Sequence, residues 1–292
     1  MPMSARLLRP RASGVHPEAA SWRTRVVANG GSVSATTMQA VDRFCRSIDA
    51  VSGLRACFYR LNLFCGTSDA SLNAVRTPLY LGRSLGGTQF GGTTDTNANF
   101  VADDYAETGA SGGLKGNGTT KRLATGLAGS NLNGHNLHLS AYEISPTTGA
   151  FDASVGLRTN FSAPGAYLTT GGVATTYEIS FGNNSIQDAL GSAPTGHWIG
   201  VQAGNRTGVL YRNGVSRSTT YTIGANTTND FSTLAHDFAV FAINDGGTPN
   251  VFRDISATRL GGYSIGLSMT GQQAAAFYTA MQAFQTALAR NV

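Results

Sequence analysis

The sequence predicts a mainly β protein, a two-sheet antiparallel jelly-roll sandwich with one helix near the N-terminus and one C-terminal helix. Three observations lead to this fold class. Short runs of alternating apolar and polar residues recur from about residue 121 onward, as expected for half-buried strands. Glycine makes up 37 of 292 residues, well above the usual ~7%, so tight turns should be frequent. Apolar residues at helical spacing are found near each end of the chain.

The composition argues against several other classes of protein. Charged residues make up 13% of the chain, compared with about 25% in an average protein and more in a coiled coil. The apolar content of 41% is too high for a disordered chain. The glycines are scattered, which excludes a collagen-like repeat. Because no apolar run approaches the roughly 18 residues of a membrane span, no membrane partner is expected.

The first predicted elements are a helix, a strand and a long glycine-rich segment. The helix should begin at Ser34 or Thr36, either of which can cap it, and end at Gly53. Its apolar residues are Met38, Val41, Cys45 and Ile48. The strand should follow at 59–65. Residues 66–120 would form an unusually long loop, so their larger apolar side chains are expected to pin them to the body.

A series of strands and a final helix follow. The strands are expected at 137–144, 175–181, 198–203, 208–217, 236–243 and 260–267. The segment 208–217 should be a hairpin, because Asn213-Gly214 suits a type I′ turn with positive φ at both residues. A capping box from Thr270 to Gln273 begins the C-terminal helix. Its apolar stripe favours core packing over a partner-binding face, and consists of Phe277, Met281, Phe284 and Leu288.

Positive charge is concentrated near the N-terminus. Residues 1–60 hold nine arginines and three acidic residues, a net charge of +6, whereas residues 61–292 carry −1. Three prolines among the first 17 residues oppose a helix, so residues 1–30 are predicted to be a basic extended arm. The arm would dock on an acidic partner or a neighbouring subunit through Arg6, Arg9, Arg11, Arg23 and Arg25. The alternative is a basic, frayed terminus without a partner.

The cysteines and the first 20 residues indicate the cellular compartment in which the chain folds. Cys45, Cys57 and Cys65 are odd in number and few, which argues against a disulfide scaffold. The first 20 residues have no apolar core of signal-peptide length. The chain is therefore expected to fold in a reducing cytoplasm with free thiols.

The C-terminal part of the chain contains motifs of a known fold family. In order, these are LYRNGVSR, HDFAVFAINDGGTP and FRDISATRLGGYSIGLSMTGQQAAAFYTAMQAFQTALAR, with ANFVADDYAETGASGGLKGNGTTKRLATGL upstream. They resemble the concanavalin A-like lectin/glucanase (laminin-G-like) jelly roll. The resemblance implies a jelly-roll domain at 98–292, with 31–97 as a helix, strand and Gly/Thr/Asn-rich segment packed on that body. Domains of this kind bind glycans, cleave glycans or serve as structural modules, so the resemblance implies fold better than activity.

Two upstream segments, VANGGSVSATTMQAVDRFCRSIDA and LFCGTSDASLNAVRTPLYLG, make the whole chain similar to uncharacterised structural proteins of tailed phages and prophages. This resemblance implies a non-enzymatic virion protein, exposed as a capsid decoration or a tail/fibre component and docked through its arm. Its partners would be other virion proteins, such as the major capsid or tail proteins, and it would form a homo-oligomer. The alternative is a carbohydrate-binding module that recognises host surface glycans, and a glycoside hydrolase is the third hypothesis. The aromatic residues considered for a sugar site are each expected in the sandwich core instead: Tyr105, Trp198, Tyr211 and Tyr263.

No catalytic pattern stands out. Glucanases of this superfamily place paired carboxylates on one strand, as in E-x-D-x-E, so that an acid and a nucleophile flank the sugar bond. Here Glu143 and Glu178 are each alone in a predicted strand, and adjacent Asp103 and Asp104 would face opposite sides. The protein is therefore predicted not to be an enzyme. Nucleic acid is not an expected partner either, because the body is nearly neutral.

One metal-binding candidate is present. Asp95, Asn97 and Asn99 have the D-x-N-x-N spacing of a calcium loop, and Asp103 follows closely. The pattern then departs, because its sixth position is Phe100 rather than glycine. Asx turns explain the same residues without a metal. If calcium binds, Asp95, Asn97 and Asp103 are the first choices as ligands, and otherwise no cofactor is expected.

Overall fold

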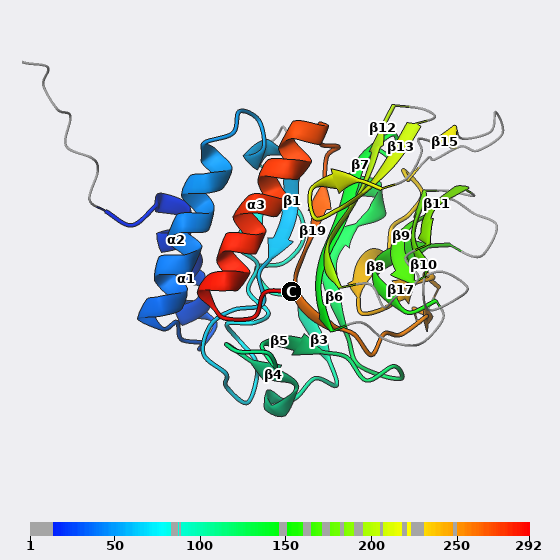
Figure 1. Ribbon diagram of the computed structural model, residues 1–292. Coiled ribbons are helices and arrows are strands. Elements are labelled where there is room, and N and C mark those ends of the chain that lie inside the picture. The colour runs from blue at the N-terminus through cyan, green and yellow to red at the C-terminus, as the bar shows by residue number, and fades with distance from the viewer. Residues whose placement is uncertain are drawn as a thin grey trace, which may run out of the picture.

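Two antiparallel sheets face each other and form the predicted sandwich (Figure 1). The computed structural model describes residues 14–82, 87, 89–145, 151–159, 165–170, 176–181, 184–189, 195–204, 207–217, 221–222, 231–247 and 250–292. The mainly β fold class is therefore confirmed, with one helix more than expected near the N-terminus. In the part of the chain that is described, no helix has the length and apolarity needed to cross a membrane.

The first sheet runs in the order β14-β13-β12-β7-β19-β1-β2. Its strands are β1 (Phe58–Asn62), β2 (Tyr80–Leu81), β7 (Asn136–Ser145), β12 (Gly196–Ala203), β13 (Thr207–Arg212), β14 (Val215–Ser216) and β19 (Arg259–Gly266). Three short strands extend it: β15 (Tyr221–Thr222) on β13, β5 (Gly113–Lys115) on β19, and β4 (Tyr105–Ala106) on β5. The long strands β7 and β19 pair near the centre, so segments from both halves of the chain build this sheet.

The second sheet runs in the order β11-β10-β9-β8-β16-β6-β3. Its strands are β3 (Thr96–Ala98), β6 (Arg122–Ala128), β8 (Ala153–Arg158), β9 (Gly165–Thr170), β10 (Thr176–Phe181), β11 (Asn184–Ala189) and β16 (Asp237–Val240). The short strand β17 (Ile243–Asn244) pairs in parallel with β8 and antiparallel with β18 (Phe252–Arg253). Three single-turn helices are η1 (Arg55–Cys57), η2 (Ala102–Asp104) and η3 (Gly129–Asn131).

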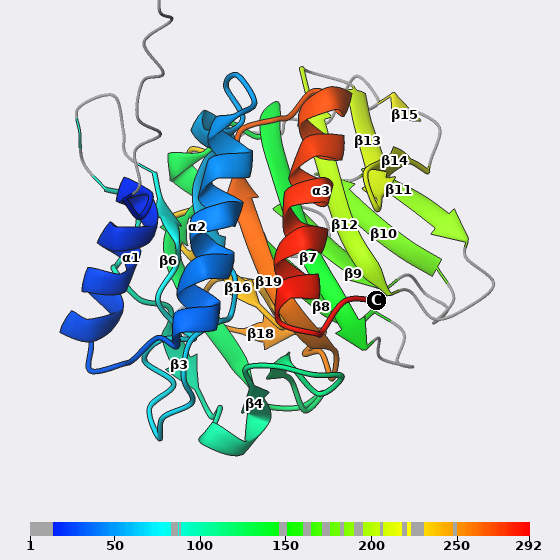
Figure 2. The same ribbon diagram turned by 60° about the vertical axis from the view of Figure 1, so that its left-hand side comes forward.

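Helices α1 (Pro17–Ala28), α2 (Ala35–Asp49) and α3 (Gly271–Ala287) form a third layer against the outer face of the first sheet (Figure 2). The molecule consequently has two apolar clusters, one between the sheets and one between the first sheet and the helices. Phe277 of α3 links the layers, because its ring centroid lies 4.8 Å from that of Phe58 in β1 and 6.4 Å from that of Phe44 in α2. The helical layer therefore buries the outer face of this sheet.

Local signals in the sequence located several elements. The Asn213-Gly214 hairpin is confirmed, with φ of +52° and +75° at the two turn residues. Ser34 caps α2 by accepting a hydrogen bond from the Thr37 amide, as predicted, but the helix ends at Asp49 rather than at Gly53. The capping box of α3 is formed between Thr270 and Gln273. The apolar stripe of α3 is buried, which confirms its role in core packing.

The prediction of an extended arm over residues 1–30 is wrong for residues 17–28, which form α1. Pro17 is the first helical residue, a position where the missing N–H needs no partner. The His16 side chain caps the helix by accepting a hydrogen bond from the Glu18 amide. Trp22 is buried and its Nε1 donates a hydrogen bond to the Thr77 carbonyl at 2.9 Å. Residues 1–13 lie outside the described residues.

Residues 31–97 are also more closely integrated than a segment packed on the body. They supply β1 and β2 to the first sheet and β3 to the second. The predicted boundary between residues 97 and 98 falls inside β3, so it does not separate two structural units. Most of the larger apolar residues of the long glycine-rich segment are buried, as a pinned segment requires: Leu79, Tyr80, Phe100, Tyr105 and Leu114. Phe90 is half-buried.

Candidate functional site

The five arginines predicted to form a docking arm differ in their positions and contacts. Arg6, Arg9 and Arg11 lie outside the described residues. Arg25 donates hydrogen bonds to the carbonyls of Pro78 at 3.1 Å and Leu79 at 2.7 Å, so it holds α1 to the body. Arg23 is exposed on α1 and, within the described part of the chain, has no hydrogen-bond or ion-pair partner. Of the described pair, Arg23 is thus the one available to a partner.

The three calcium candidates do not share a site. Asp95 is fully buried: its Oδ1 accepts hydrogen bonds from Arg60 Nε and Tyr263 Oη, both at 2.8 Å, and its Oδ2 accepts one from Asn62 Nδ2 at 2.8 Å.

The remaining two candidates lie elsewhere. Asn97 forms an Asx-type turn with the backbone of Phe100, and Asp103 is exposed. Among the described residues, no group of three or more His, Cys, Asp or Glu side chains could hold a metal ion. The geometry therefore favours the Asx-turn alternative over the calcium loop.

The two carboxylates that stand alone in predicted strands, Glu143 and Glu178, lie on opposite sides of the second sheet. Glu143 of β7 points between the sheets, where it accepts hydrogen bonds from Tyr177 Oη at 2.5 Å and from Ser154 Oγ. Because Tyr177 points inward, its neighbour Glu178 faces outward, where it accepts a hydrogen bond from Gln187 at 2.7 Å. These two carboxylates cannot flank one sugar bond.

The surroundings of the three cysteines are those of structural residues. Cys45, Cys57 and Cys65 are buried and none is in a disulfide. Burial raises the pKa of the Cys45 and Cys65 thiols to about 12. Thiols with such a pKa are poor nucleophiles and poor metal ligands.

An open hollow of about 810 Å³ lies where the N-terminus of α1, the end of α2, β1 and β2 meet. We call it the Arg55 hollow, after an exposed arginine that lines it. Arg55 Nη1 lies 3.2 Å from Asp49 Oδ2, and its Nη2 bonds to Glu18. His16 Nε2 lies 3.0 Å from the same Asp49 oxygen. The hollow therefore presents hydrogen-bond donors and acceptors at fixed positions.

Aromatic residues are among those that line this hollow. The Arg55 guanidinium lies 5.4 Å from the ring centroid of Tyr80. Tyr59 is half-buried, packs against the apolar cluster between the sheets and stacks on Phe90, with centroids 4.7 Å apart. A ring that is supported on one side and partly open is suited to pack against the apolar face of a ligand.

A β-bulge explains the position of Tyr59. Phe58 pairs with Gly266 and Arg60 pairs with Ile265, so Tyr59 is an extra residue in β1 without a partner in β19. Such a bulge re-aims the side chain of the extra residue. Simple alternation along the strand places Tyr59 with Leu61, and the sequence gave no signal for the bulge. Sequence reasoning therefore missed the Arg55 hollow.

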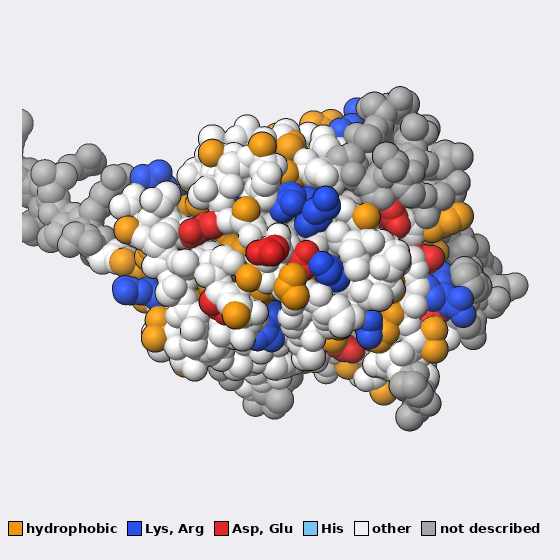
Figure 3. Space-filling model, turned by 90° about the horizontal axis from the view of Figure 1, so that it is seen from below, with side chains coloured by type: hydrophobic (Ala, Val, Ile, Leu, Met, Phe, Trp, Pro, Cys, Tyr) orange, Lys and Arg blue, Asp and Glu red, His pale blue; other side chains and the backbone are white. Residues whose placement is uncertain are grey.

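The aromatic residues considered from the sequence are less accessible. Tyr105, Trp198 and Tyr263 are buried, as expected for core residues, and Tyr211 is partly buried. On the face seen in Figure 3, basic and acidic side chains lie close together and hydrophobic ones are scattered. The described part of that face therefore shows no single-sign surface of the kind that binds nucleic acid.

No family model matches this chain, and no curated protein matches it either. Among solved structures, domain 4 of AbnA, an extracellular arabinanase from Geobacillus stearothermophilus solved with arabinotriose, has a TM-score of 0.43 at 15% identity. That comparison covers 76% of this chain and 98% of that one. Trypanosoma rangeli sialidase gives a TM-score of 0.42 at 10% identity over 82% of this chain and 39% of that one. The binding domain of botulinum neurotoxin DC gives 0.33 at 7% identity, covering 56% and 40%. With TM-scores below 0.5, these likenesses carry no argument about what this protein binds.

Proposed function

We propose that the protein is a non-catalytic carbohydrate-binding module with its saccharide site in the Arg55 hollow. The observation that carries this proposal is a partly exposed tyrosine, Tyr59, that lines the same hollow as a guanidinium paired with two carboxylates. The apolar C–H face of a sugar packs on such a ring. Its hydroxyl groups bond to charged donors and acceptors around it. The volume of about 810 Å³ also lies within the range of small-ligand sites.

The charges in the hollow favour a neutral sugar. Arg55 faces both Glu18 and Asp49, so the guanidinium has no charge left over for an anionic ligand. Arg25 adds a further positive charge 3.8 Å from Glu18, which balances the second carboxylate. An acidic sugar would have to approach two carboxylates, and this costs Coulomb energy. We therefore assign neutral oligosaccharides as the ligand class.

The same pairing supports binding rather than hydrolysis. A glycosidase needs one carboxylic acid that donates a proton to the leaving group and a second carboxylate that acts as base or nucleophile. Both acids of the hollow bond to one guanidinium. They are therefore engaged with the same arginine and do not face each other as an acid and a nucleophile on either side of a sugar bond.

The experiment is affinity electrophoresis of the full chain in gels that contain neutral polysaccharides: arabinan, galactan, xylan, mannan and β-glucan. Wild-type protein should be retarded by at least one of them. Tyr59→Ala should weaken that binding about tenfold, because stacking and ring contacts contribute roughly 1–2 kcal/mol. Tyr211→Ala, a half-buried tyrosine on β13, is the matched control and should bind as wild type. Equal retardation of wild type and Tyr59→Ala would exclude the Arg55 hollow as the site, and no retardation by any polysaccharide would overturn the function.

The place of this module in a tailed-phage particle, and its assembly as a homo-oligomer with capsid or tail proteins, stay predictions. A glycan-binding module on the outside of a virion is compatible with both hypotheses from the sequence. Mass spectrometry of density-gradient-purified particles tests the location. A signal stoichiometric with the capsid or tail proteins supports it, and absence from clean particles overturns it.

A further inference from the structure

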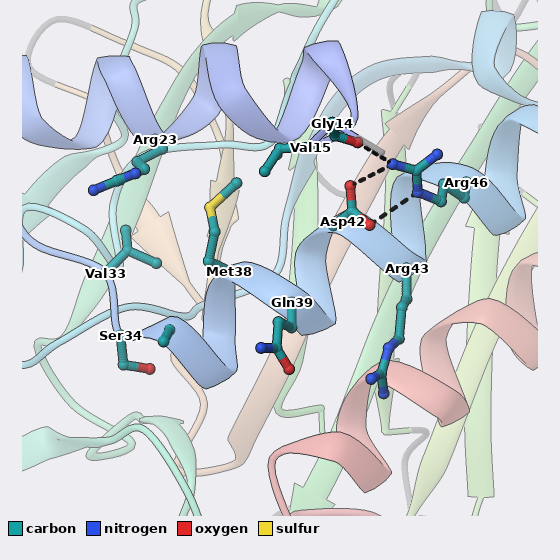
Figure 4. A pocket seen from close by; sticks show the side chains of 11 residues that line it. Gly14, Val15, Arg23, Val33, Ser34, Met38, Gln39, Asp42, Arg43 and Arg46 are labelled. Carbon is teal, nitrogen blue, oxygen red and sulfur yellow. Dashed lines mark hydrogen bonds and ion pairs between the residues drawn. The ribbon is translucent and has the colours of Figure 1, made fainter. Parts of the chain in front are cut away.

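A second open region lies between α1 and α2, away from the Arg55 hollow. We call it the α1–α2 groove; its volume is about 760 Å³ (Figure 4). Its walls come from Val15, which precedes α1, from Arg23 of α1, and from Met38, Asp42 and Arg43 of α2. Figure 4 shows Val15 and Met38 between the two helices, with the Arg23 side chain extending from α1.

The centre of the groove is apolar. Val15 is 51% exposed, and Met38 and Val33 beside it are half-buried. A smaller hollow of about 370 Å³ shares Val15, Arg23 and Met38 and continues to Val27, which is 59% exposed. Exposed apolar side chains that adjoin one another and are rimmed by polar groups are typical of protein-binding surfaces.

The charges around this apolar strip are not balanced. Asp42 is fully engaged: it accepts hydrogen bonds from Arg46 Nε at 2.9 Å and from the His16 amide at 2.6 Å. Arg46 also donates to the Gly14 carbonyl at 2.6 Å. Arg23 and Arg43 are exposed, and neither has a hydrogen bond or ion pair with another described residue. Two guanidinium groups are thus left for a partner.

The charges also discriminate between occupants. Residues 1–13 of this chain contain three arginines and no acidic residue, so this segment would be repelled by Arg23 and Arg43. A nucleic acid would pair with the arginines but would leave the apolar strip without a contact.

We propose that the α1–α2 groove docks an acidic segment of another protein. Carboxylates of that segment pair with Arg23 and Arg43, and one of its apolar side chains packs on Val15 and Met38. Arginine is suited to this role because it pairs with carboxylates in a bidentate manner. The site goes beyond the saccharide site, because it would recognise a protein and has no lining residue in common with the Arg55 hollow.

The test uses a nine-residue peptide of glutamate and leucine, added to the full chain with ¹³C-methyl-labelled methionines. The Met38 methyl resonance is the local reporter, and the buried Met269 and Met281 are internal references. The peptide should shift the Met38 signal saturably. A peptide with Gln in place of Glu, and another with Ser in place of Leu, should each bind about tenfold more weakly.

The variant Arg23→Gln/Arg43→Gln should weaken binding of the original peptide by about tenfold or more. Lys115→Gln, at an exposed lysine on β5, is the control for general loss of positive charge and should leave binding unchanged. Four results would overturn the proposal. These are equal binding of the Gln peptide, no saturable shift of Met38 up to about 1 mM peptide, tighter binding of duplex DNA, and self-association that the double variant abolishes. The third would assign the groove to nucleic acid and the fourth to a second copy of this chain.

Discussion

The space between the two sheets and the surface formed by α1 and α2 both contain arginines, but they differ in whether these charges have partners. Between the sheets, Arg60 and Asp95 form an ion pair at 0% exposure, and Tyr263 and Asn62 complete the hydrogen bonds of the carboxylate. On α1 and α2, Arg23 and Arg43 are exposed and unpaired among the described residues. The difference shows which charges maintain the fold and which are available for binding.

The Arg55 hollow is intermediate between these two regions in the pairing and exposure of its arginine. Its guanidinium is paired with two carboxylates, yet the Arg55 side chain remains 42% exposed. Such a group is held in place and can still exchange water for the hydroxyl groups of a ligand. Pairing without burial is therefore the feature that distinguishes the proposed saccharide site from both other regions.

The largest expected effect comes from breaking the buried pair. Asp95→Ala leaves Arg60 buried without a counter-charge and should lower the free energy of unfolding by about 3–5 kcal/mol. Urea denaturation followed by tryptophan fluorescence measures this loss. The double variant Arg60→Met/Asp95→Leu should recover most of it, because apolar replacements of a buried pair leave no uncompensated charge. A loss below about 1 kcal/mol for Asp95→Ala would contradict a structural role for the pair.

A smaller, pH-dependent effect is expected from Glu143. Burial raises its pKa to about 7 from a reference value of 4.5, against the opposing hydrogen bonds of Ser154 and Tyr177. The folded protein thus keeps this proton where the unfolded chain releases it. The stability linked to Glu143 is fully present below pH 4.5 and is lost as the pH rises through about 7. Glu143→Gln should therefore gain stability relative to wild type between pH 5 and 8, by about 2–3 kcal/mol at most.

Two buried histidines act in the opposite direction. Burial lowers the pKa of His138 to about 4 and that of His197 to about 3. Because the unfolded chain binds these protons near pH 6.5, stability linked to the histidines is present above pH 6.5 and is lost as the pH falls. Urea unfolding of wild type from pH 4 to 8 should peak near pH 6.5, whereas Glu143→Gln should show no decline above it. A decline of the same size in both proteins would contradict the assignment to Glu143.

The smallest effect on stability is expected in the α1–α2 groove. Arg23→Gln and Arg43→Gln remove exposed charges that have no partner within the described protein, so each should change the free energy of unfolding by less than about 0.5 kcal/mol. The same urea series provides the measurement. A loss above about 1 kcal/mol would show that these arginines stabilise the fold and are not reserved for a partner.

The sequence predicted those features that depend on neighbouring residues. The Asn213-Gly214 turn and the Thr270 capping box follow from local backbone requirements, and both were located correctly. Helix α1 was missed because Pro17 was interpreted as a helix breaker, although proline is favourable at the first helical position.

The features missed by the sequence depend on distant contacts. The partner of Asp95 lies 35 residues away in β1, so a local calcium pattern looked equally suitable. The bulge at Tyr59 arises from the register with β19, some 200 residues later in the chain. The residues next to Tyr59 carry no sequence signal that predicts the bulge. Both the buried ion pair and the Arg55 hollow could therefore be seen only once the strands were placed together.

Hydrogen exchange of the full chain, with and without the neutral oligosaccharide that binds in the gel screen, locates the saccharide on the backbone. If the saccharide binds in the Arg55 hollow, exchange should slow at Arg55–Tyr59 and at Tyr80–Gly82, with no change at the α1–α2 groove. Protection confined to another surface, such as the outer face of the second sheet, would contradict it.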